Sequence, residues 1–329
     1  MSALAPTLQA FFTDRLARQR DASPNTIAAY RDTWKLLLTY ISHQIGKPPS
    51  QFDLADLDAE IIAAFLDHLE DDRGNSASTR NARLAAIRSL FRFAVLRHPE
   101  HAADIERVLA IPTKRTDRPL INYLTDPEID ALLAAPDVTT WFGRRDRALL
   151  ALAIQTGLRI SELTGLRCGD LHLGTGAYVA CHGKGRKDRT TPLTRASCRV
   201  LHAWLTERAG RPDDPLFPTR QGARLSRDAL ERRVKVHTSH AAVTCPSLAT
   251  KTISAHVLRH TAAMRLLHAG IDTSVIALWL GHENLETTQI YLRADLTLKE
   301  RAINRTTPLR TPPGRYQPDD TTLAFLDSL

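Results

Sequence analysis

Residues 111–119, with the sequence IPTKRTDRP, interrupt the hydrophobic pattern of the chain. This segment contains two prolines and four charged residues of mixed sign, a composition typical of an exposed linker. The chain has 329 residues, and a single domain commonly spans about 100–200 residues. We therefore predict two domains, residues 1–110 and 120–306, joined by the linker 111–119 and followed by a C-terminal tail, 307–329.

Residues 8–97 have the pattern of a small helical bundle and show no convincing strand. Ser23 followed by Pro24 is typical of a helix cap and first turn. Apolar residues then recur at helical spacing, at Ile27, Tyr30, Trp34, Leu37, Leu38 and Ile41. Similar apolar faces predict further helices at about 59–70 and 77–97.

The second domain has a mixed pattern. Thr125 and Glu128 form a predicted capping box that starts a helix through Leu133. Helices are predicted at 144–156 and 159–165, and short strands at 177–182 and 189–193, with the turn-like sequence GKGRKD between them. Helices then dominate to about residue 303. The tail contains prolines and then a short apolar run, which predicts either a docking helix or a frayed terminus.

Composition places limits on the protein class. A hydrophobic share of 43% and a charged share of 24% are typical of a globular protein. The net charge of +8 suits a surface that meets nucleic acid, although many basic proteins bind none. Since we find neither a membrane-spanning run nor a signal peptide, we expect a cytoplasmic protein without membrane contact. The cysteines form no CxxC pair and are expected to be reduced: Cys168, Cys181, Cys198 and Cys245.

Residues 251–291 carry the densest chemical signal. His256 and Arg259 are three positions apart, beside the apolar stripe of a predicted helix, so we expect both at the rim of a buried face. Gly281 is predicted to end the following helix and to deliver His282 just beyond it. Tyr291 follows on a further helix, so these four polar side chains can converge.

Two upstream segments are also rich in chemistry, and each has an ordinary alternative. In TGLRISEL, Arg159 stands at a helix start, where backbone amides favour anions, with Glu162 one turn later. The alternative is an ordinary surface Arg–Glu pair. The sequence GKGRKDR lacks the spacing of a nucleotide-binding loop and leads into a strand. It is therefore either a mobile basic hairpin or a solvated charged turn.

These residue types together suit phosphoryl transfer. Two guanidinium groups and histidine donors can bind the oxygens of a phosphoryl transition state, supplying the positive charge that Mg²⁺ often supplies. A tyrosine can act as a nucleophile, and a lysine on a hairpin can protonate a leaving hydroxyl.

The motifs TGLRISEL, GKGRKDR, HVLRH and LGH, with Tyr291 nine residues after His282, resemble the tyrosine recombinases, or phage integrases, and look closest to the chromosome-dimer-resolving Xer type. The resemblance covers about residues 120–295, and SPNTIAAYRDTW is similar to part of the family's core-binding domain. It implies a mainly α fold with a small β-sheet (an α+β catalytic domain). A helical, SAM-like core-binding domain and an integrase-type catalytic domain would form a clamp around DNA.

The resemblance also implies residue roles. Arg159 and Arg259 would bind the scissile phosphate, and His282 would donate a hydrogen bond to it. Tyr291 would attack the phosphorus to give a 3′-phosphotyrosine, and Glu162 would support the site.

Proton transfer would involve two further residues. Lys184 would protonate the departing 5′ oxygen, although Lys187 lies on the same predicted hairpin and could compete for this role. His256 would act as base or positioning donor. The resemblance implies no cofactor, metal or ATP.

The partners implied are double-stranded DNA at specific recombination sites and further subunits, in a homotetramer or a heterotetramer with a related recombinase. Base-reading residues are expected within 24–41, 79–97 and 226–237.

Three rival functions remain open at this point. One is a type IB topoisomerase, and another is a catalytically silent DNA-binding protein. The third is a zinc enzyme, since His256 and His260 are four apart, but Val257 stands where a zincin needs glutamate. His260 and the four tryptophans, Trp34, Trp141, Trp204 and Trp279, are interpreted as packing residues.

Overall fold

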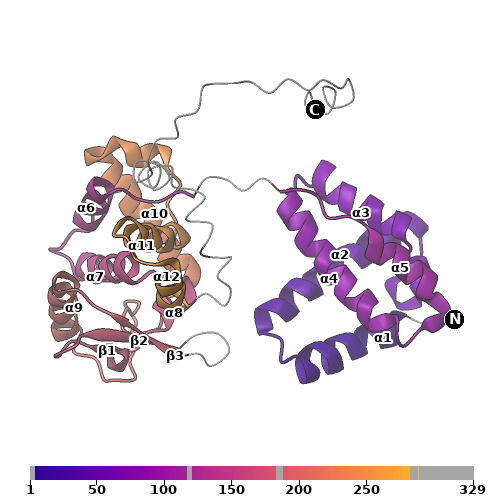
Figure 1. The fold of residues 1–329 in the computed structure, drawn as a ribbon, viewed down its shortest axis with the longest axis horizontal. Coiled ribbons are helices and arrows are strands. Elements are labelled where there is room, and N and C mark those ends of the chain that lie inside the picture. Colours follow the sequence, from indigo (N-terminus) through magenta and orange to yellow (C-terminus); the bar gives the residue numbers. More distant parts are fainter. Residues whose placement is uncertain (1–3, 117–120, 183–187, 282–287, 289–329) are drawn as a thin grey trace, which may run out of the picture. The chain divides into compact units, whose positions relative to one another are not determined.

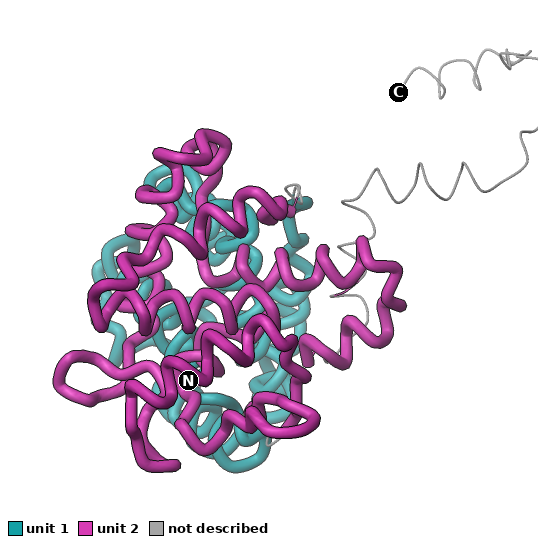
Figure 2. The backbone as a smooth tube through the Cα atoms, turned by 90° about the vertical axis from the view of Figure 1, so that its left-hand side faces the viewer, with its two compact units in different colours: residues 1–119 teal, residues 120–329 magenta. Residues whose placement is uncertain are grey.

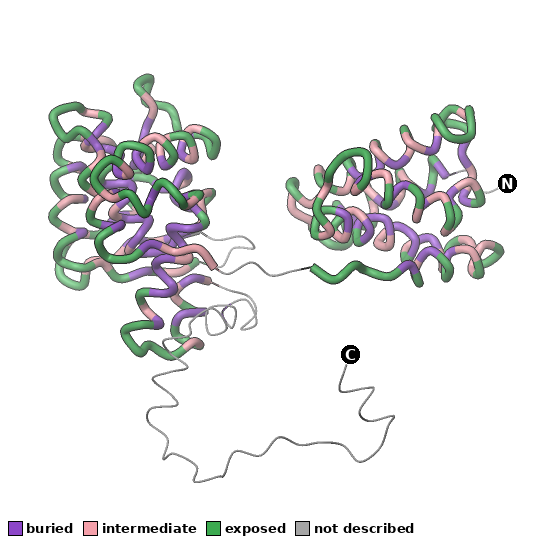
Figure 3. The backbone as a smooth tube through the Cα atoms, turned by 90° about the horizontal axis from the view of Figure 1, so that it is seen from above, coloured by how far each residue is buried: buried purple, intermediate pink, exposed green. Residues whose placement is uncertain are grey.

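The computed structural model describes residues 4–116, 121–182, 188–281 and 288, without the side chain of His182. The chain divides into two compact units, residues 1–119 and 120–329 (Figure 2). Each unit has its own hydrophobic core, drawn as the buried segments of Figure 3.

Unit 1 is built from helices (Figure 1). In chain order they are α1 Leu4–Ala10, a π-helix at Phe11–Gln19, α2 Pro24–Ile45, short 3₁₀ turns at Pro49–Gln51 and Leu54–Asp56, α3 Ala59–Asp71, α4 Ala77–Ala94, a 3₁₀ turn at Pro99–His101 and α5 Ala102–Ala110. The predicted helical bundle is confirmed, but α4 ends three residues earlier than expected and α5 was not predicted.

The start of α2 is formed as the sequence indicates. The Ser23 hydroxyl accepts a hydrogen bond from the Thr26 amide at 3.3 Å, and Pro24 occupies the first turn. Helix α2 ends at Gly46, whose φ of 67° lies in the left-handed region that glycine adopts readily. Trp34 and Phe65 are among the largest buried side chains of this unit, so its helices pack through their predicted apolar faces.

The segment after α5 is held against unit 1. Ile111 is buried in the core of the unit. The Asn81 side chain brackets the Lys114 backbone, donating to its carbonyl at 2.8 Å and accepting from its amide at 3.0 Å. Arg80 donates to the Pro112 carbonyl at 3.1 Å. Residues 112–114 of the expected linker therefore have no regular secondary structure, but side chains of α4 bind their backbone.

Unit 2 combines helices with a small sheet. In chain order its elements are α6 Asp126–Ala134, α7 Trp141–Thr156, α8 Ile160–Gly165, a 3₁₀ turn at Cys168–Asp170, β1 Leu171–His172, β2 Tyr178–His182, β3 Asp188–Pro192, α9 Arg195–Arg208, α10 Arg227–Thr244, a 3₁₀ helix at Pro246–Thr250, α11 Ala255–His268 and α12 Thr273–Leu280. The strands form an antiparallel sheet in the order β1-β2-β3, with Cys181 opposite Arg189.

The predicted mixed pattern of this unit is confirmed. The Thr125 amide donates to the Glu128 carboxylate at 2.8 Å, as the capping box requires. Strands β2 and β3 lie within one residue of the expected bounds. Strand β1 was missed because two residues are too short for a periodic pattern.

The tryptophans pack as expected. Trp34 and Trp204 are buried, and Trp141 and Trp279 pack against the core clusters of unit 2. The four cysteines are free, and burial raises the pKa of Cys181 to about 12, so its thiol stays protonated at neutral pH. Within the described residues, no helix is both long and apolar enough to cross a membrane.

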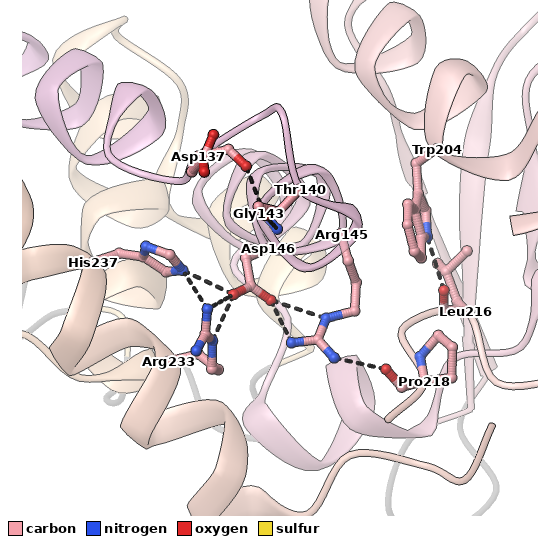
Figure 4. A network of polar contacts seen from close by, with 10 residues as sticks. All are labelled: Asp137, Thr140, Gly143, Arg145, Asp146, Trp204, Leu216, Pro218, Arg233 and His237. Carbon is pink, nitrogen blue, oxygen red and sulfur yellow. Dashed lines mark hydrogen bonds and ion pairs between the residues drawn. The ribbon is translucent and has the colours of Figure 1, made fainter. Parts of the chain in front are cut away.

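A buried ion-pair network joins α7 to α10 (Figure 4). One Asp146 carboxylate oxygen accepts from the Arg145 guanidinium, at 2.9 and 2.7 Å. The other contacts His237 Nε2 at 2.8 Å and Arg233 Nε at 2.6 Å. Burial opposes ionisation of Asp146, but the His237 hydrogen bond and the Arg145 charge outweigh it and lower the pKa. The network therefore fixes α10, through an ionised carboxylate, on the central helix α7.

Candidate active site

Arg159 stands at the junction between α7 and α8. Helix α7 ends at Gly157, with a φ of 63°, and α8 begins directly after Arg159. The Arg159 amide donates to Glu162 Oε2 at 2.7 Å, and its guanidinium donates to Oε1 at 3.1 Å. The Arg–Glu pair that the spacing indicates is thus present, but the Glu162 side chain is only 5% exposed, so this is not an ordinary surface pair.

Arg259 lies on α11 and is buried, with 4% exposure, whereas we expected it at the rim. Its guanidinium donates to the Gly157 carbonyl at 2.7 Å and to the Leu280 carbonyl at 2.8 Å. These carbonyls lie at the ends of α7 and α12, where helices leave backbone acceptors without intrahelical partners. Arg259 is drawn inward because it satisfies both helix ends.

The end of α12 brings three arginines together. Three successive carbonyls at this end each accept a hydrogen bond from a different arginine. The Trp279 carbonyl accepts from Arg189 Nε at 3.2 Å, the Leu280 carbonyl accepts from Arg259, and the Gly281 carbonyl accepts from Arg159 Nη2 at 2.7 Å. A helix C-terminus carries partial negative charge, so cations are favoured there. In Figure 1, α8, β3 and α12 accordingly lie side by side. Gly281 ends α12 with a φ of 66°, as predicted.

Arg189, the second residue of β3, was not singled out in the sequence. Its Nη1 and Nη2 donate to the two oxygens of Glu162 at 2.9 and 2.8 Å. Burial opposes ionisation of Glu162, but the Arg189 hydrogen bonds, the Arg159 amide and the two positive charges lower its pKa. Glu162 is therefore an ionised carboxylate shared by two arginines. The sequence indicated only that Arg189 belongs to a basic segment. It did not indicate the ion pair, because Glu162 lies 27 residues earlier in the chain.

His256 lies one turn before Arg259 on α11. Its ring meets that of His260 edge to face, with centroids 4.2 Å apart. Partial burial and the Arg259 charge lower the pKa of His256. Burial and the neighbouring His256 and Arg259 lower the pKa of His260 to about 4. Both rings are neutral at neutral pH, and a neutral imidazole can accept a proton.

His260 is half-buried, in keeping with a packing role. Among the residues that the structure describes, no group of three or more histidine, cysteine or acidic side chains is placed to hold a metal ion.

The described part of the site therefore unites Arg159, Glu162, His256 and Arg259. The other four candidates lie outside the described residues: Lys184, Lys187, His282 and Tyr291. So does the tail, 307–329.

Comparison with known proteins gives the family. The phage integrase family profile matches residues 122–297, and that of the phage integrase N-terminal SAM-like domain matches residues 10–98. The chain belongs to the phage integrase family. A relative from Sinorhizobium fredii, named "Putative integrase/recombinase y4rC", is 52% identical over 328 residues, covering 100% of this chain and 99% of the relative. Tyrosine recombinase XerD of Pseudomonas putida is 33% identical over 299 residues, covering 88% and 94%.

Solved structures agree with this fold. A lambda integrase tetramer bound to a Holliday junction matches with a TM-score of 0.60 at 17% identity, covering 94% of this chain and 80% of that one. The resemblance and the fold class predicted from the sequence are confirmed. The protein is a tyrosine-type site-specific recombinase, an enzyme that cleaves and rejoins DNA. This assignment is favoured over a type IB topoisomerase and over a silent DNA-binding protein.

Proposed function

We propose that this recombinase cleaves DNA by attack of Tyr291 on a phosphate held by Arg159 and Arg259. The observation that supports it best is the convergence of the two arginines. They come from segments about 100 residues apart and donate to adjacent carbonyls, Leu280 and Gly281. Two guanidinium groups in one place can bind phosphate oxygens and stabilise the charge of the transition state. His282, directly after Gly281, would add a hydrogen bond.

The proposed proton transfers balance the reaction. The bond between the Tyr291 oxygen and phosphorus forms as the bond from phosphorus to the 5′ oxygen breaks. His256, neutral at neutral pH, takes the phenolic proton or positions the phosphate, and Lys184 gives a proton to the 5′ oxygen, with Lys187 as its competitor. One phosphodiester replaces another, so religation needs no ATP, and the arginines supply the positive charge.

The chemistry is tested by trapping the covalent intermediate. The full chain is incubated in EDTA with a nicked, radiolabelled genomic DNA pool and resolved on a denaturing gel. We expect an adduct with wild type and with the matched control Tyr178→Phe on β2, and none with Tyr291→Phe. An adduct in Tyr291→Phe would contradict the assignment of the nucleophile. Tight DNA binding by wild type without any adduct would indicate a silent binder or an absent activating partner.

The arginine assignment has its own test in the same assay. Arg159→Ala and Arg259→Ala should each lower the rate of adduct formation by at least about 100-fold, since removing one preorganised donor commonly costs this much. Retention of the wild-type rate by either variant would remove that arginine from the site.

We further propose that the two domains, residues 1–110 and 120–306, clamp DNA between them. The first part of helix α10, residues 227–237, lies within a predicted base-reading range, and its exposed side chains include Arg227, Arg232 and Lys235. Basic side chains on an exposed helix face suit phosphate and base contacts. The buried Asp146 network would hold this helix in register.

The proposed assembly is a tetramer on two DNA sites, either of identical chains or with a related recombinase. The lambda integrase tetramer on a Holliday junction supports it by likeness of fold. The apolar residues of the tail 307–329 suit docking on a neighbouring subunit. Mass measurement of the active complex on paired sites tests the assembly, and an active monomer would exclude it.

We propose a mobile DNA element in the cytoplasm as the setting, because the 52% identical relative carries the name integrase/recombinase. Sequencing of the DNA ends trapped in the covalent adduct would reveal the site. Ends that map to a single chromosomal locus without a flanking element would favour chromosome resolution instead.

A further inference from the structure

Glu162 accepts hydrogen bonds from two guanidinium groups that differ in exposure. The Arg189 side chain is 14% exposed and contacts both carboxylate oxygens. The Arg159 side chain is 40% exposed and contacts one oxygen, at 3.1 Å. The buried arginine thus has the bidentate pairing, and the exposed arginine has the weaker contact.

We propose that Arg189 is a positioning residue of the recombination site, which neutralises Glu162 and thereby leaves the charge of Arg159 available to the scissile phosphate. The proposal rests on the phosphate-binding role proposed for Arg159. It concerns a residue that does not itself have to touch DNA.

The charges explain the need for Arg189. Arg159, Glu162 and Arg189 together carry a net charge of +1. Without Arg189, the remaining pair would sum to zero, and a phosphate would approach a neutralised guanidinium. Glu162 would also be free to form a bidentate pair with Arg159, which is the geometry that a phosphate itself uses. The carboxylate would then compete with the substrate for one side chain.

Arg189 also spans the elements that hold the site. Its Nε donates to the Trp279 carbonyl, and its guanidinium passes over Gly281. A Cβ atom at Gly281 would lie 2.9 Å from Arg189 Nη1, so glycine leaves the space that the guanidinium occupies. An experiment must therefore separate the charge of Arg189 from its role as a link to α12.

The decisive comparison uses the full chain with Arg189→Met, with Glu162→Gln and with both changes. Binding of inorganic phosphate is measured by calorimetry, with Arg159→Ala as the background. Adduct formation with the nicked DNA pool is measured in parallel. We expect Arg189→Met to weaken phosphate binding and adduct formation by about tenfold, as loss of a neighbouring unit charge does at a partly buried site.

Rescue distinguishes charge from structure. The double variant should recover to within about threefold of Glu162→Gln alone, because no carboxylate remains to compete. Arg189→Lys keeps the charge and should retain most of the binding. The control Arg199→Met removes an exposed charge on α9 and should change neither readout.

Three results would overturn the proposal. They are wild-type phosphate binding by Arg189→Met, a double variant no better than Arg189→Met, and equal losses in the Lys and Met variants. Unfolding midpoints are recorded for all variants. If Arg189→Met does not fold, the proposal is decided by comparing phosphate binding and adduct formation of the double variant with those of Glu162→Gln. If wild type forms no adduct, that result counts against the proposed cleavage or indicates an absent activating partner, whereas phosphate binding still tests Arg189.

Discussion

Replacement of Asp146 by asparagine tests whether the network in Figure 4 stabilises unit 2. The side chain keeps its size but loses the charge that faces Arg145, Arg233 and His237. The Arg145 side chain is 3% exposed, so its positive charge would remain buried after its counter-charge is removed. Removing one partner of a buried ion pair costs about 3–5 kcal/mol.

The expected result is a large fall in stability of unit 2. A domain of this size loses about 2–4 °C in Tm per kcal/mol, so the midpoint should fall by roughly 10 °C. Thermal unfolding followed by tryptophan fluorescence is a suitable measurement, because Trp141, Trp204 and Trp279 lie in unit 2 and Trp141 packs near Arg145.

A second ion pair on the same helix provides the control. Arg144 pairs with Glu207 of α9, at 2.7 Å for each of two hydrogen bonds, but this pair is exposed to solvent. Glu207→Gln should therefore change the unfolding midpoint little, since water already solvates both charges. If Asp146→Asn lowers the unfolding midpoint no more than Glu207→Gln does, burial of the network is not what makes it stabilising, and the reasoning is refuted.

Acid provides an independent check on Asp146. Its pKa in the folded protein lies below the ordinary value of 3.8, so its stabilisation is complete above that value and is lost as the pH falls through the folded pKa. The difference between wild type and Asp146→Asn should be constant from pH 8 to about pH 5 and narrow below about pH 4. A difference that narrows near neutral pH would point to another titrating group.

Three further expectations concern other parts of the chain. Burial would raise the pKa of Glu128, but the hydrogen bond and charge of Lys251 lower it to about 2. Between pH 4.5 and 2 the free energy of unfolding of wild type should therefore fall by about 3 kcal/mol more than that of Glu128→Gln, as measured by urea titration. Gly157→Ala should lower Tm and adduct formation, because its Cβ would lie 2.7 Å from Leu280 at a φ of 63°. Asn81→Ala should speed tryptic cleavage after Lys114, because it removes two hydrogen bonds to the Lys114 backbone. An unchanged cleavage rate would show that these hydrogen bonds do not protect residues 111–116.

Local features of the fold could be predicted from the sequence because they depend on neighbouring residues. The cap at Ser23, the capping box at Thr125 and the helix stop at Gly281 require side chains or backbone angles within a few positions. The roles of Arg159 and Arg259 were suggested by motif resemblance, and the structure brings the two side chains together at the end of α12.

Features that depend on distant partners could not be predicted. Asp146 stands in the charged sequence RRDR, which is typical of an exposed helix face, but its two partners on α10 follow 87 and 91 residues later. Periodicity placed Arg259 beside the buried stripe of α11. Its actual burial depends on the Gly157 carbonyl, 102 residues earlier. A helical pattern predicts which face of the helix a residue occupies, but it does not predict which other element packs against that face.

The partners of the two proposed phosphate ligands explain how a cation can be fixed in place and keep its charge. Arg259 is oriented by the carbonyls of Gly157 and Leu280, which are dipoles without net charge. Arg159 is oriented partly by the Gly281 carbonyl and partly by Glu162, a full negative charge that would neutralise it. Arg189 offsets that charge. Orientation by a carbonyl dipole, and by a carboxylate that is already paired with Arg189, would leave the Arg159 guanidinium electrostatically available to the phosphate that we propose it binds.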